Sequence, residues 1–161
     1  MNSPANPAAE ANDLLSVHLT RVLRAPPQRV FDAWTTPEIM KLWWGPQGFT
    51  GINAESDPRP GGAFMIEIGN GDGEVHKMSG VYTEVSPPRL LCMEVRHRTF
   101  EGAAERPEGY IPTTVRVELR AHAEGTELTL THSGFLDAAQ VARFQGGWGG
   151  SLDKLAAVFA T

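Results

Sequence analysis

Cysteine is almost absent from this sequence, since Cys92 is the only one among 161 residues. A single cysteine cannot form an intrachain disulfide, and zinc sites built from several cysteines are excluded as well. Small secreted domains commonly depend on disulfides, so we expect a cytoplasmic protein in a reducing compartment. Cys92 itself is interpreted as a structural residue, because no helix N-terminus or adjacent base would stabilise its thiolate.

Long apolar runs are also missing. No segment approaches the roughly 20 apolar residues that a membrane helix needs, so no membrane partner is expected. The first thirteen residues, MNSPANPAAEAND, contain neither a basic region nor an apolar core and do not resemble a secretory signal. Their composition predicts a disordered tail over residues 1–13, followed by one domain over residues 14–161.

Basic residues are in the minority. The 14 Lys and Arg residues are outnumbered by 19 Asp and Glu residues, which gives a formal net charge of −5 at pH 7. A protein that binds nucleic acid normally presents a basic face, so no nucleic-acid partner is expected. The sequence also contains no HExxH zinc motif, no P-loop and no Gly-x-Ser-x-Gly motif. We therefore predict no metal site and no cofactor.

Glycine and proline, by contrast, are abundant, with 17 and 12 residues respectively. They separate segments in which apolar and polar residues alternate, and such alternation is typical of strands with one buried face. The strands predicted in this way span residues 14–24, 51–57, 63–68, 75–85, 90–98, 113–121 and 126–132. The Asn-Gly-Asp-Gly run at 70–73 predicts a hairpin turn. A long acidic loop is expected over residues 99–109.

Helices are expected after the first strand and at the C-terminus. Pro27 and Pro37 each suit a first helical position, which predicts two short helices in succession. A single apolar stripe at helical spacing predicts a long final helix and consists of Trp148, Leu152, Leu155, Ala156 and Phe159. Residues 137–144 are interpreted as a preceding helical piece, because the glycines between 146 and 150 favour a kink or close backbone packing.

This order of elements predicts an α+β fold. Its sheet would be antiparallel, curved, built from about six to seven strands and wrapped around the long C-terminal helix, with two short helices after strand one. The final helix is the only element long enough to cover the face that the sheet must bury. A strongly curved sheet around one helix leaves space between them, so we expect an internal apolar pocket.

Several short motifs resemble the activator of heat-shock-protein-90 ATPase homologue family, which belongs to the START and birch-pollen-allergen-like superfamily with its helix-grip fold. The motifs are Ala25-Pro26, VFDAW at 30–34, Trp44-Gly45-Pro46, RPGG at 59–62, GVYTEV at 80–85, GTELTLTH at 125–132 and Gly147-Trp148. They occur in order over nearly the whole chain after the tail. Because they mostly describe turns and core positions, they imply the fold more strongly than the function.

The resemblance implies a protein that binds or sequesters a small hydrophobic or aromatic molecule in its cavity, without catalysis of its own. One alternative is a cyclase- or dehydratase-like enzyme in which His97 or His132 is the general acid-base. Another is a stress-related co-chaperone that stimulates a chaperone ATPase. The family's namesakes carry an additional N-terminal domain, so a chaperone partner is the least expected of the three. Edge strands could also pair two copies into a homodimer.

Nine residues are candidates for contact with the ligand, because they are aromatic, sulfur-containing or imidazole side chains expected on the concave face or its helices. They are Trp43, Trp44, Phe64, Met78, Tyr82, Met93, His97, His132 and Trp148. Aromatic walls offer a ligand a large contact area, and a neutral imidazole can bond to a ligand carbonyl or phenol. The alternative for each aromatic residue is plain core packing, and for each histidine a strand-end contact with water or backbone.

Two further positions stand out. Arg21 falls on the apolar face of the first strand, where an unpaired charge would be costly. We interpret it as half of a structural ion pair with Glu84 or another carboxylate, with anchoring of an acidic ligand group as the alternative. His76 has no clear facing in the pattern and is expected at a solvent-exposed hairpin end.

Overall fold

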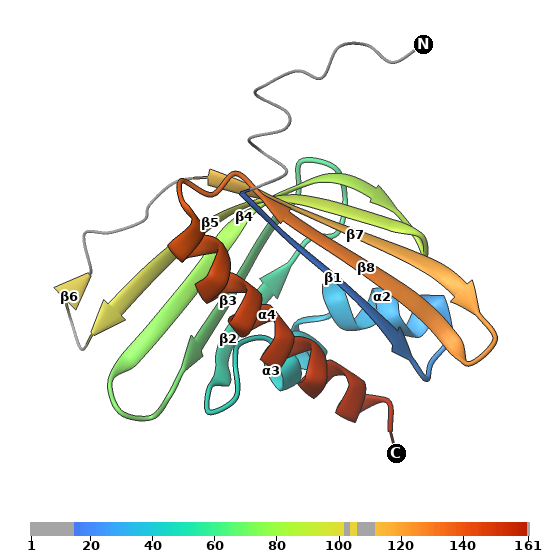
Figure 1. Cartoon of the computed structure of the whole chain (residues 1–161), viewed down its shortest axis with the longest axis horizontal. Coiled ribbons are helices and arrows are strands. Elements are labelled where there is room, and N and C mark those ends of the chain that lie inside the picture. The colour runs from blue at the N-terminus through green and yellow to red at the C-terminus, as the bar shows by residue number, and fades with distance from the viewer. Residues whose placement is uncertain (1–14, 102–103, 106–111, 161) are drawn as a thin grey trace, which may run out of the picture.

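The computed structural model describes residues 15–101, 104–105 and 112–160. Seven antiparallel strands form one sheet in the order β1-β8-β7-β5-β4-β3-β2, and the two-residue β6 pairs with β5. The strands are β1 (Ser16–Leu23), β2 (Thr50–Ser56), β3 (Ala63–Gly69), β4 (Glu74–Ser86), β5 (Leu90–Glu101), β6 (Ala104–Glu105), β7 (Pro112–His122) and β8 (Gly125–Ser133). The sheet arches over the helices (Figure 1), which confirms the predicted α+β fold with a curved sheet. The tail predicted over residues 1–13 lies outside the described residues.

Two glycines explain local features of the sheet. Gly71 lies in the β3–β4 turn with a φ of 83°, a conformation that glycine adopts without strain. The Asn70 side chain accepts hydrogen bonds from the backbone N–H groups of Asp72 and Glu74, so the predicted hairpin is present. In the middle of β4, a Cβ on Gly80 would lie 1.8 Å from the carbonyl oxygen of Glu94. Only glycine allows β4 and β5 to approach this closely where they bend.

Part of the predicted acidic loop is strand. The expectation for residues 99–109 is wrong at its start, because β5 continues to Glu101 and β6 pairs with it. A strand edge that can pair with a neighbour satisfies backbone N–H and C=O groups that a loop would leave to water. The remainder of the predicted loop lies outside the described residues.

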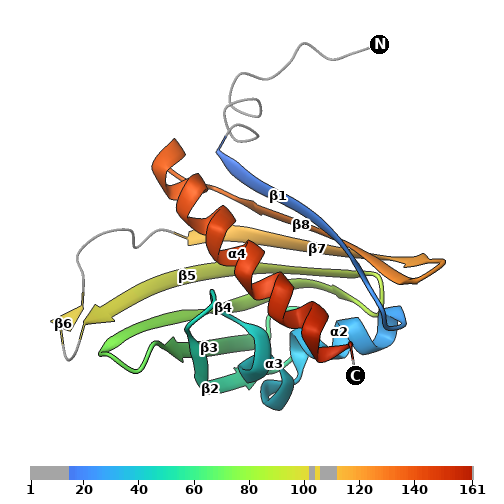
Figure 2. The same cartoon turned by 60° about the horizontal axis from the view of Figure 1, so that its bottom comes forward.

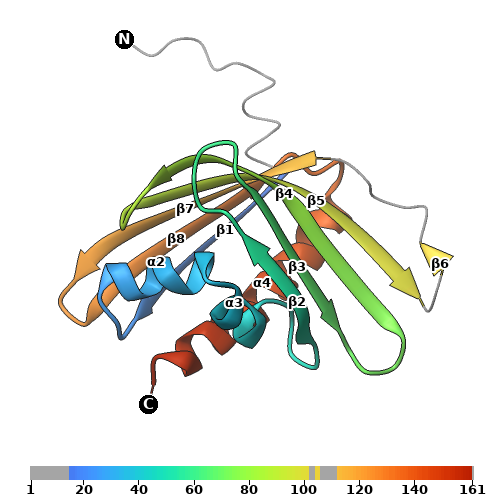
Figure 3. The same cartoon turned by 180° about the vertical axis from the view of Figure 1, so that it is seen from behind.

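Three helices lie on the concave side of the sheet: α2 (Pro27–Thr35), α3 (Pro37–Trp43) and α4 (Ala138–Val158). Each of the two short helices begins with proline, as predicted. Figure 3 shows both beneath the sheet, with α3 beside β2 and α2 under the β7 and β8 side. No helix in the described part of the chain is long and apolar enough to cross a membrane.

The long helix is continuous, so the prediction of a separate piece over 137–144 is wrong. The α4 helix has 21 residues and is about 30 Å long, and Figure 2 shows it crossing the sheet diagonally. The Asp137 side chain caps its start by accepting a bond from the backbone N–H of Gln140. The glycines stay helical because tertiary packing of the apolar stripe outweighs their low propensity.

Four tryptophans form the centre of the core. The ring of Trp34 packs against Trp43, Trp44 and Trp148 at centroid distances of 4.6, 5.8 and 5.7 Å. The indole N–H groups of Trp34 and Trp44 are buried and have no hydrogen-bond partner among the described residues. Packing in this cluster must offset that cost, which is on the order of 1–3 kcal/mol for each group.

Arg21 and Cys92 each have an interaction partner in the structure. The Nε atom of Arg21 is 3.9 Å from a carboxylate oxygen of Asp153 on α4, so the partner is Asp153 rather than Glu84. The Arg21 side chain is 34% exposed, because β1 is an edge strand. Cys92 is buried and accepts a bond from Arg116, and burial raises the pKa of its thiol. Neither residue lines the pocket described next.

Candidate functional site

A pocket of about 120 Å³ lies between the first half of α4 and the concave face of the sheet. Its lining residues come from β3, β4, β5, β8, α4 and the segment after α3. They are Trp44, Gly45, Pro46, Ile68, His76, Met78, Val95, His97, His132, Arg143, Phe144, Gly147, Trp148 and Ser151. Apolar side chains therefore form most of the wall, and the histidines, Arg143 and Ser151 supply polar side-chain atoms.

Five of the nine predicted residues line this pocket: Trp44, Met78, His97, His132 and Trp148. The other four are buried outside it. The indole N–H of Trp43 donates to the carbonyl oxygen of Ala33 at 2.9 Å, and the Tyr82 hydroxyl bonds to Ser56 at 2.7 Å. Phe64 packs on Tyr82, and Met93 lies opposite Tyr82 on the neighbouring strand. Phe64, Tyr82 and Met93 form core on the concave face, displaced along the strands from the pocket, and Trp43 belongs to the core from α3.

His132 is locked by hydrogen bonds on both ring nitrogens. Its Nδ1 accepts the indole N–H of Trp148 at 2.9 Å, so Nδ1 carries no proton. The neutral ring then bears its proton on Nε2, which donates to the Thr113 hydroxyl at 2.7 Å. That hydroxyl in turn donates to the carbonyl oxygen of Val95 at 3.3 Å. Since both nitrogens are occupied, His132 can act as an acid or base only if one of these bonds breaks.

Burial explains the charge state of His132. Its side chain is almost fully buried, and desolvation lowers its pKa from 6.5 to about 3, with His97 adding a smaller effect in the same direction. The ring is therefore neutral at physiological pH. His132 is therefore a structural histidine. Its hydrogen bonds join β8, β7 and α4 at the back of the pocket.

A second chain of bonds runs along β4 and β5. The carboxylate of Glu74 lies 2.6 Å from Nε2 of His76, and Nδ1 of His76 lies 2.8 Å from Nε2 of His97. The two imidazole rings also stack, with centroids 5.0 Å apart. Because an ionised carboxylate can only accept, Nε2 of His76 is the donor in the first bond. In the uncharged form of His76, its Nδ1 accepts from Nε2–H of His97, and this leaves Nδ1 of His97 as an acceptor.

The expectation that His76 is solvent-exposed is wrong. Its side chain is only 19% exposed and lines the pocket. The alternation of side chains along a strand predicts the inward position of His76, because His76 and Met78 are two residues apart and must share a face of β4. Its closeness to His97 depends on the register, in which His97 lies opposite Met78.

Arg143 is the second polar residue that sequence reasoning missed. It is exposed on α4 and still contributes to the pocket lining, so it marks the side where the pocket meets solvent. It forms no ion pair with any described residue. Burial, His76 and Arg143, in that order, lower the pKa of His97 from 6.5 to about 4. Arg143 therefore acts electrostatically on the histidine across the pocket.

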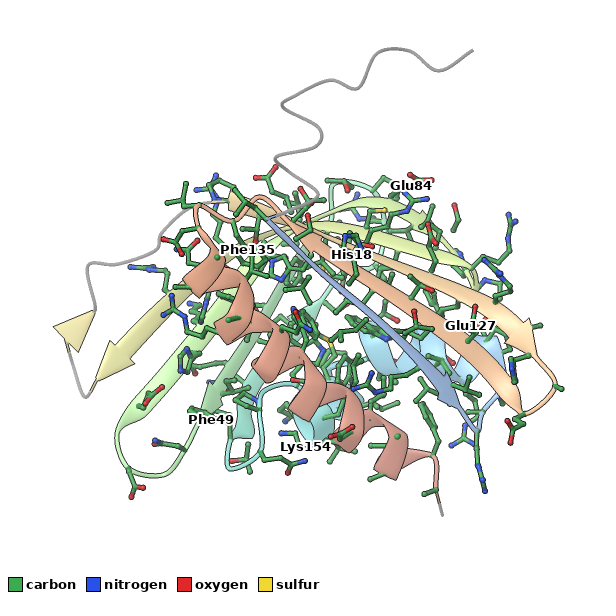
Figure 4. The ribbon with its side chains drawn as sticks, in the orientation of Figure 1. His18, Phe49, Glu84, Glu127, Phe135 and Lys154 are labelled. Carbon is green, nitrogen blue, oxygen red and sulfur yellow. The ribbon has the colours of Figure 1, made fainter. Side chains whose placement is uncertain are left out.

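The segment after α3 forms one side of the pocket, and Lys154 fixes this segment to α4. The Lys154 ammonium donates to the carbonyl oxygens of Trp44, Pro46 and Phe49 at 3.4, 3.4 and 3.0 Å. Figure 4 shows Lys154 and Phe49 on the same side of the molecule. Gly150 lets this segment approach α4, because a Cβ there would lie 3.2 Å from the backbone nitrogen of Gln47.

The described residues contain no group of three or more His, Cys, Asp or Glu side chains that could hold a metal ion. The pocket offers imidazole, guanidinium and hydroxyl groups together with aromatic faces. One acceptor, one cation and several rings offer hydrogen bonding and apolar contact to a small organic molecule.

Comparison with known proteins places the chain among structures of similar fold. Residues 24–160 match the family model described as Activator of Hsp90 ATPase homolog 1-like protein. Protein CV1439 from Chromobacterium violaceum is 28% identical with a TM-score of 0.78, covering 91% of this chain and 98% of that one. The AHSA1 protein from Silicibacter pomeroyi is 26% identical with a TM-score of 0.75, covering 90% and 97%.

A further structural relative shares the fold alone. DynU16, a protein from the dynemicin biosynthetic locus, is 21% identical with a TM-score of 0.69. The alignment covers 91% of this chain and 48% of DynU16. No curated protein matches the sequence.

Proposed function

We propose that this chain, which belongs to the Activator of Hsp90 ATPase homolog 1-like family, binds a small hydrophobic or aromatic molecule in the pocket beneath α4. The family match confirms the resemblance predicted from the sequence motifs. Proteins of this fold commonly bind hydrophobic ligands. The observation that carries the proposal is the pocket wall, in which aromatic and aliphatic side chains surround a few polar atoms.

The pocket volume limits the size of the ligand. A buried cavity of about 150 Å³ lined by apolar side chains holds a benzene molecule. The pocket here, at about 120 Å³, is comparable, and it opens to solvent beside Arg143. We therefore favour a molecule with a single aromatic ring over a long-chain lipid or a fused polycyclic compound.

The aromatic wall suits such a ring. Trp44 and Trp148 pack edge to face with centroids 5.3 Å apart, and Phe144 lies across the pocket near His97. Aromatic pairs in these geometries contribute about 0.5–1.5 kcal/mol beyond the area that they bury. Because this wall is preformed, a ring that enters the pocket does not have to reorganise it.

Filling the pocket tests the proposal. Gly147 lines the pocket, and a Cβ added to it meets nothing within 4 Å, so the side chain of Gly147→Leu would occupy the ligand's space. Gly146→Leu is the matched control, because it adds the same side chain one residue away, also into open space, at a position outside the pocket lining.

The measurement is quenching of tryptophan fluorescence by 4-nitrotoluene, since Trp44 and Trp148 line the site. We expect saturable quenching in the native protein and in Gly146→Leu, and at least ten-fold weaker binding in Gly147→Leu. Equal affinity in a folded Gly147→Leu variant would refute the proposal. So would the lack of saturable binding by 4-nitrotoluene and by other single-ring compounds in the native protein.

A further inference from the structure

The geometry points to a ligand with a phenolic hydroxyl, which donates its proton to Nδ1 of His97 while its oxygen accepts from the Arg143 guanidinium. This inference deepens the proposed function and rests on it. His97 and Arg143 form a polar corner of the pocket, and this corner selects among single-ring molecules. Glu74 and His76 support that corner without touching the ligand.

The direction of the hydrogen bonds along β4 and β5 decides which nitrogen of His97 is open to a ligand. The Glu74 carboxylate accepts from Nε2–H of His76, so in the uncharged form of His76 the remaining nitrogen, Nδ1, accepts from Nε2–H of His97. This order leaves the lone pair on Nδ1 of His97 without a hydrogen bond from any described residue. A ligand that satisfies this atom must therefore bring a donor, either O–H or N–H.

A positive charge lies opposite His97. Arg143 lines the same pocket from α4 and has no carboxylate partner among the described residues. Its guanidinium offers five N–H donors and no acceptor, so it selects an oxygen with a lone pair or a negative charge. A cationic ligand group would be repelled here, because no described carboxylate lines the pocket to offset Arg143.

One hydroxyl group satisfies both residues. Its hydrogen is donated to His97, and its oxygen accepts from Arg143. A ketone supplies no proton for His97, and a carboxylate places a lone pair against Nδ1. A protonated amine is a cation without a lone pair, so it cannot accept a hydrogen bond from Arg143. An aromatic hydroxyl further places its ring against the apolar wall, where Phe144 lies edge to face with His97 at 5.1 Å.

His97 accepts the hydroxyl proton as a hydrogen bond and does not take it from the ligand. Burial, His76 and Arg143 lower the pKa of His97 from 6.5 to about 4, so its imidazole is a weaker base than a phenolate. His132 is the other titratable group near His97, and it stays neutral because burial lowers its pKa to about 3. The bound phenol is therefore expected to keep its proton.

The experiment compares 4-nitrophenol with 4-nitrotoluene, which has a methyl group in place of the hydroxyl. Quenching of tryptophan fluorescence measures both affinities, and the absorption band of the phenolate reports ionisation of bound 4-nitrophenol across a pH titration. Arg143→Met removes the charge and the N–H donors but keeps an unbranched, flexible side chain. Arg120→Met, at an exposed residue of β7 outside the pocket, is the control for the change in net charge.

We expect the native protein and Arg120→Met to bind 4-nitrophenol about ten-fold more tightly than 4-nitrotoluene, because a hydrogen bond to a charged group contributes on that order. The phenolate absorption band should show that bound 4-nitrophenol keeps the proton that it donates to His97. Arg143→Met should lose the preference for 4-nitrophenol and bind 4-nitrotoluene as the native protein does. His97→Leu should lose the preference for 4-nitrophenol.

Two results would overturn the inference. The first is equal affinity for the two compounds in the native protein, which would leave the proposed binding of single-ring molecules intact. The second is an unchanged preference in Arg143→Met. If neither these two compounds nor other single-ring compounds bind the native protein, the inference and the proposed function both fail.

Discussion

Acidification from pH 7 to pH 5 should destabilise the native protein through His132. In the native state burial lowers the pKa of His132 to about 3, whereas the unfolded chain has the ordinary value of 6.5. Below pH 6.5 the unfolded state therefore binds a proton that the native state does not. Stability is fully present above pH 6.5 and falls as the pH is lowered from there toward 3.

The magnitude follows from this difference in proton binding. Each pH unit within the window costs about 1.4 kcal/mol, so lowering the pH from 7 to 5 removes about 2 kcal/mol for His132. His97, whose pKa is lowered to about 4, contributes a similar amount over the same interval. We expect a total loss of about 4 kcal/mol from the two histidines.

Urea unfolding followed by tryptophan fluorescence at pH 7 and pH 5 measures this loss. In His132→Asn the pH-dependent loss should fall to about half, because asparagine does not titrate. The comparison uses the change with pH within each protein, so the constant cost of the substitution cancels. His18→Asn is the matched control, because it makes the same substitution at a histidine on the exposed face of β1 (Figure 4). A full native loss in His132→Asn would refute the assignment of His132 as a buried neutral base.

Two further predictions concern the contact between α4 and the segment after α3, and the glycines of α4. Lys154→Met should lower the free energy of unfolding by about 2 kcal/mol, because three carbonyl groups lose a charged donor, and urea unfolding would detect this loss. An unchanged midpoint would show that the ammonium does not hold the segment. Gly146→Ala should raise stability by about 1 kcal/mol, since its Cβ meets open space, whereas Gly150→Ala should gain less because its Cβ lies 3.2 Å from the nitrogen of Gln47. Equal increases in the midpoint of thermal unfolding for Gly146→Ala and Gly150→Ala would contradict the close packing at Gly150.

Strand parity predicted which side chains face inward, but it did not predict which of them border the pocket. Met78 and Tyr82 share a face of β4, yet only Met78 lines the pocket. The difference is their distance along the strand from the place where α4 crosses. Parity is a local property of the backbone, whereas the crossing point depends on side chains that are distant in the sequence.

The two neighbouring tryptophans after α3 illustrate the same limit. Trp43 and Trp44 are indistinguishable by composition, and both were predicted to contact ligand. In the structure, Trp43 bonds to the carbonyl oxygen of Ala33 in the core, whereas Trp44 borders the pocket. The α3 helix ends at Trp43, so the change of backbone direction at that residue turns the two rings to different sides.

The sequence by itself determined the family, the α+β fold, the order of its strands and helices, and the inward face that carries His97 and His132. These follow from local periodicity, from proline and glycine at turns, and from short motifs. The tertiary structure decided that His132 is fully bonded, that Glu74 and His76 stand behind His97, and that Arg143 lies across the pocket. Each of these depends on strand register or on the position of α4 over the sheet, which are set by packing between residues far apart in the chain.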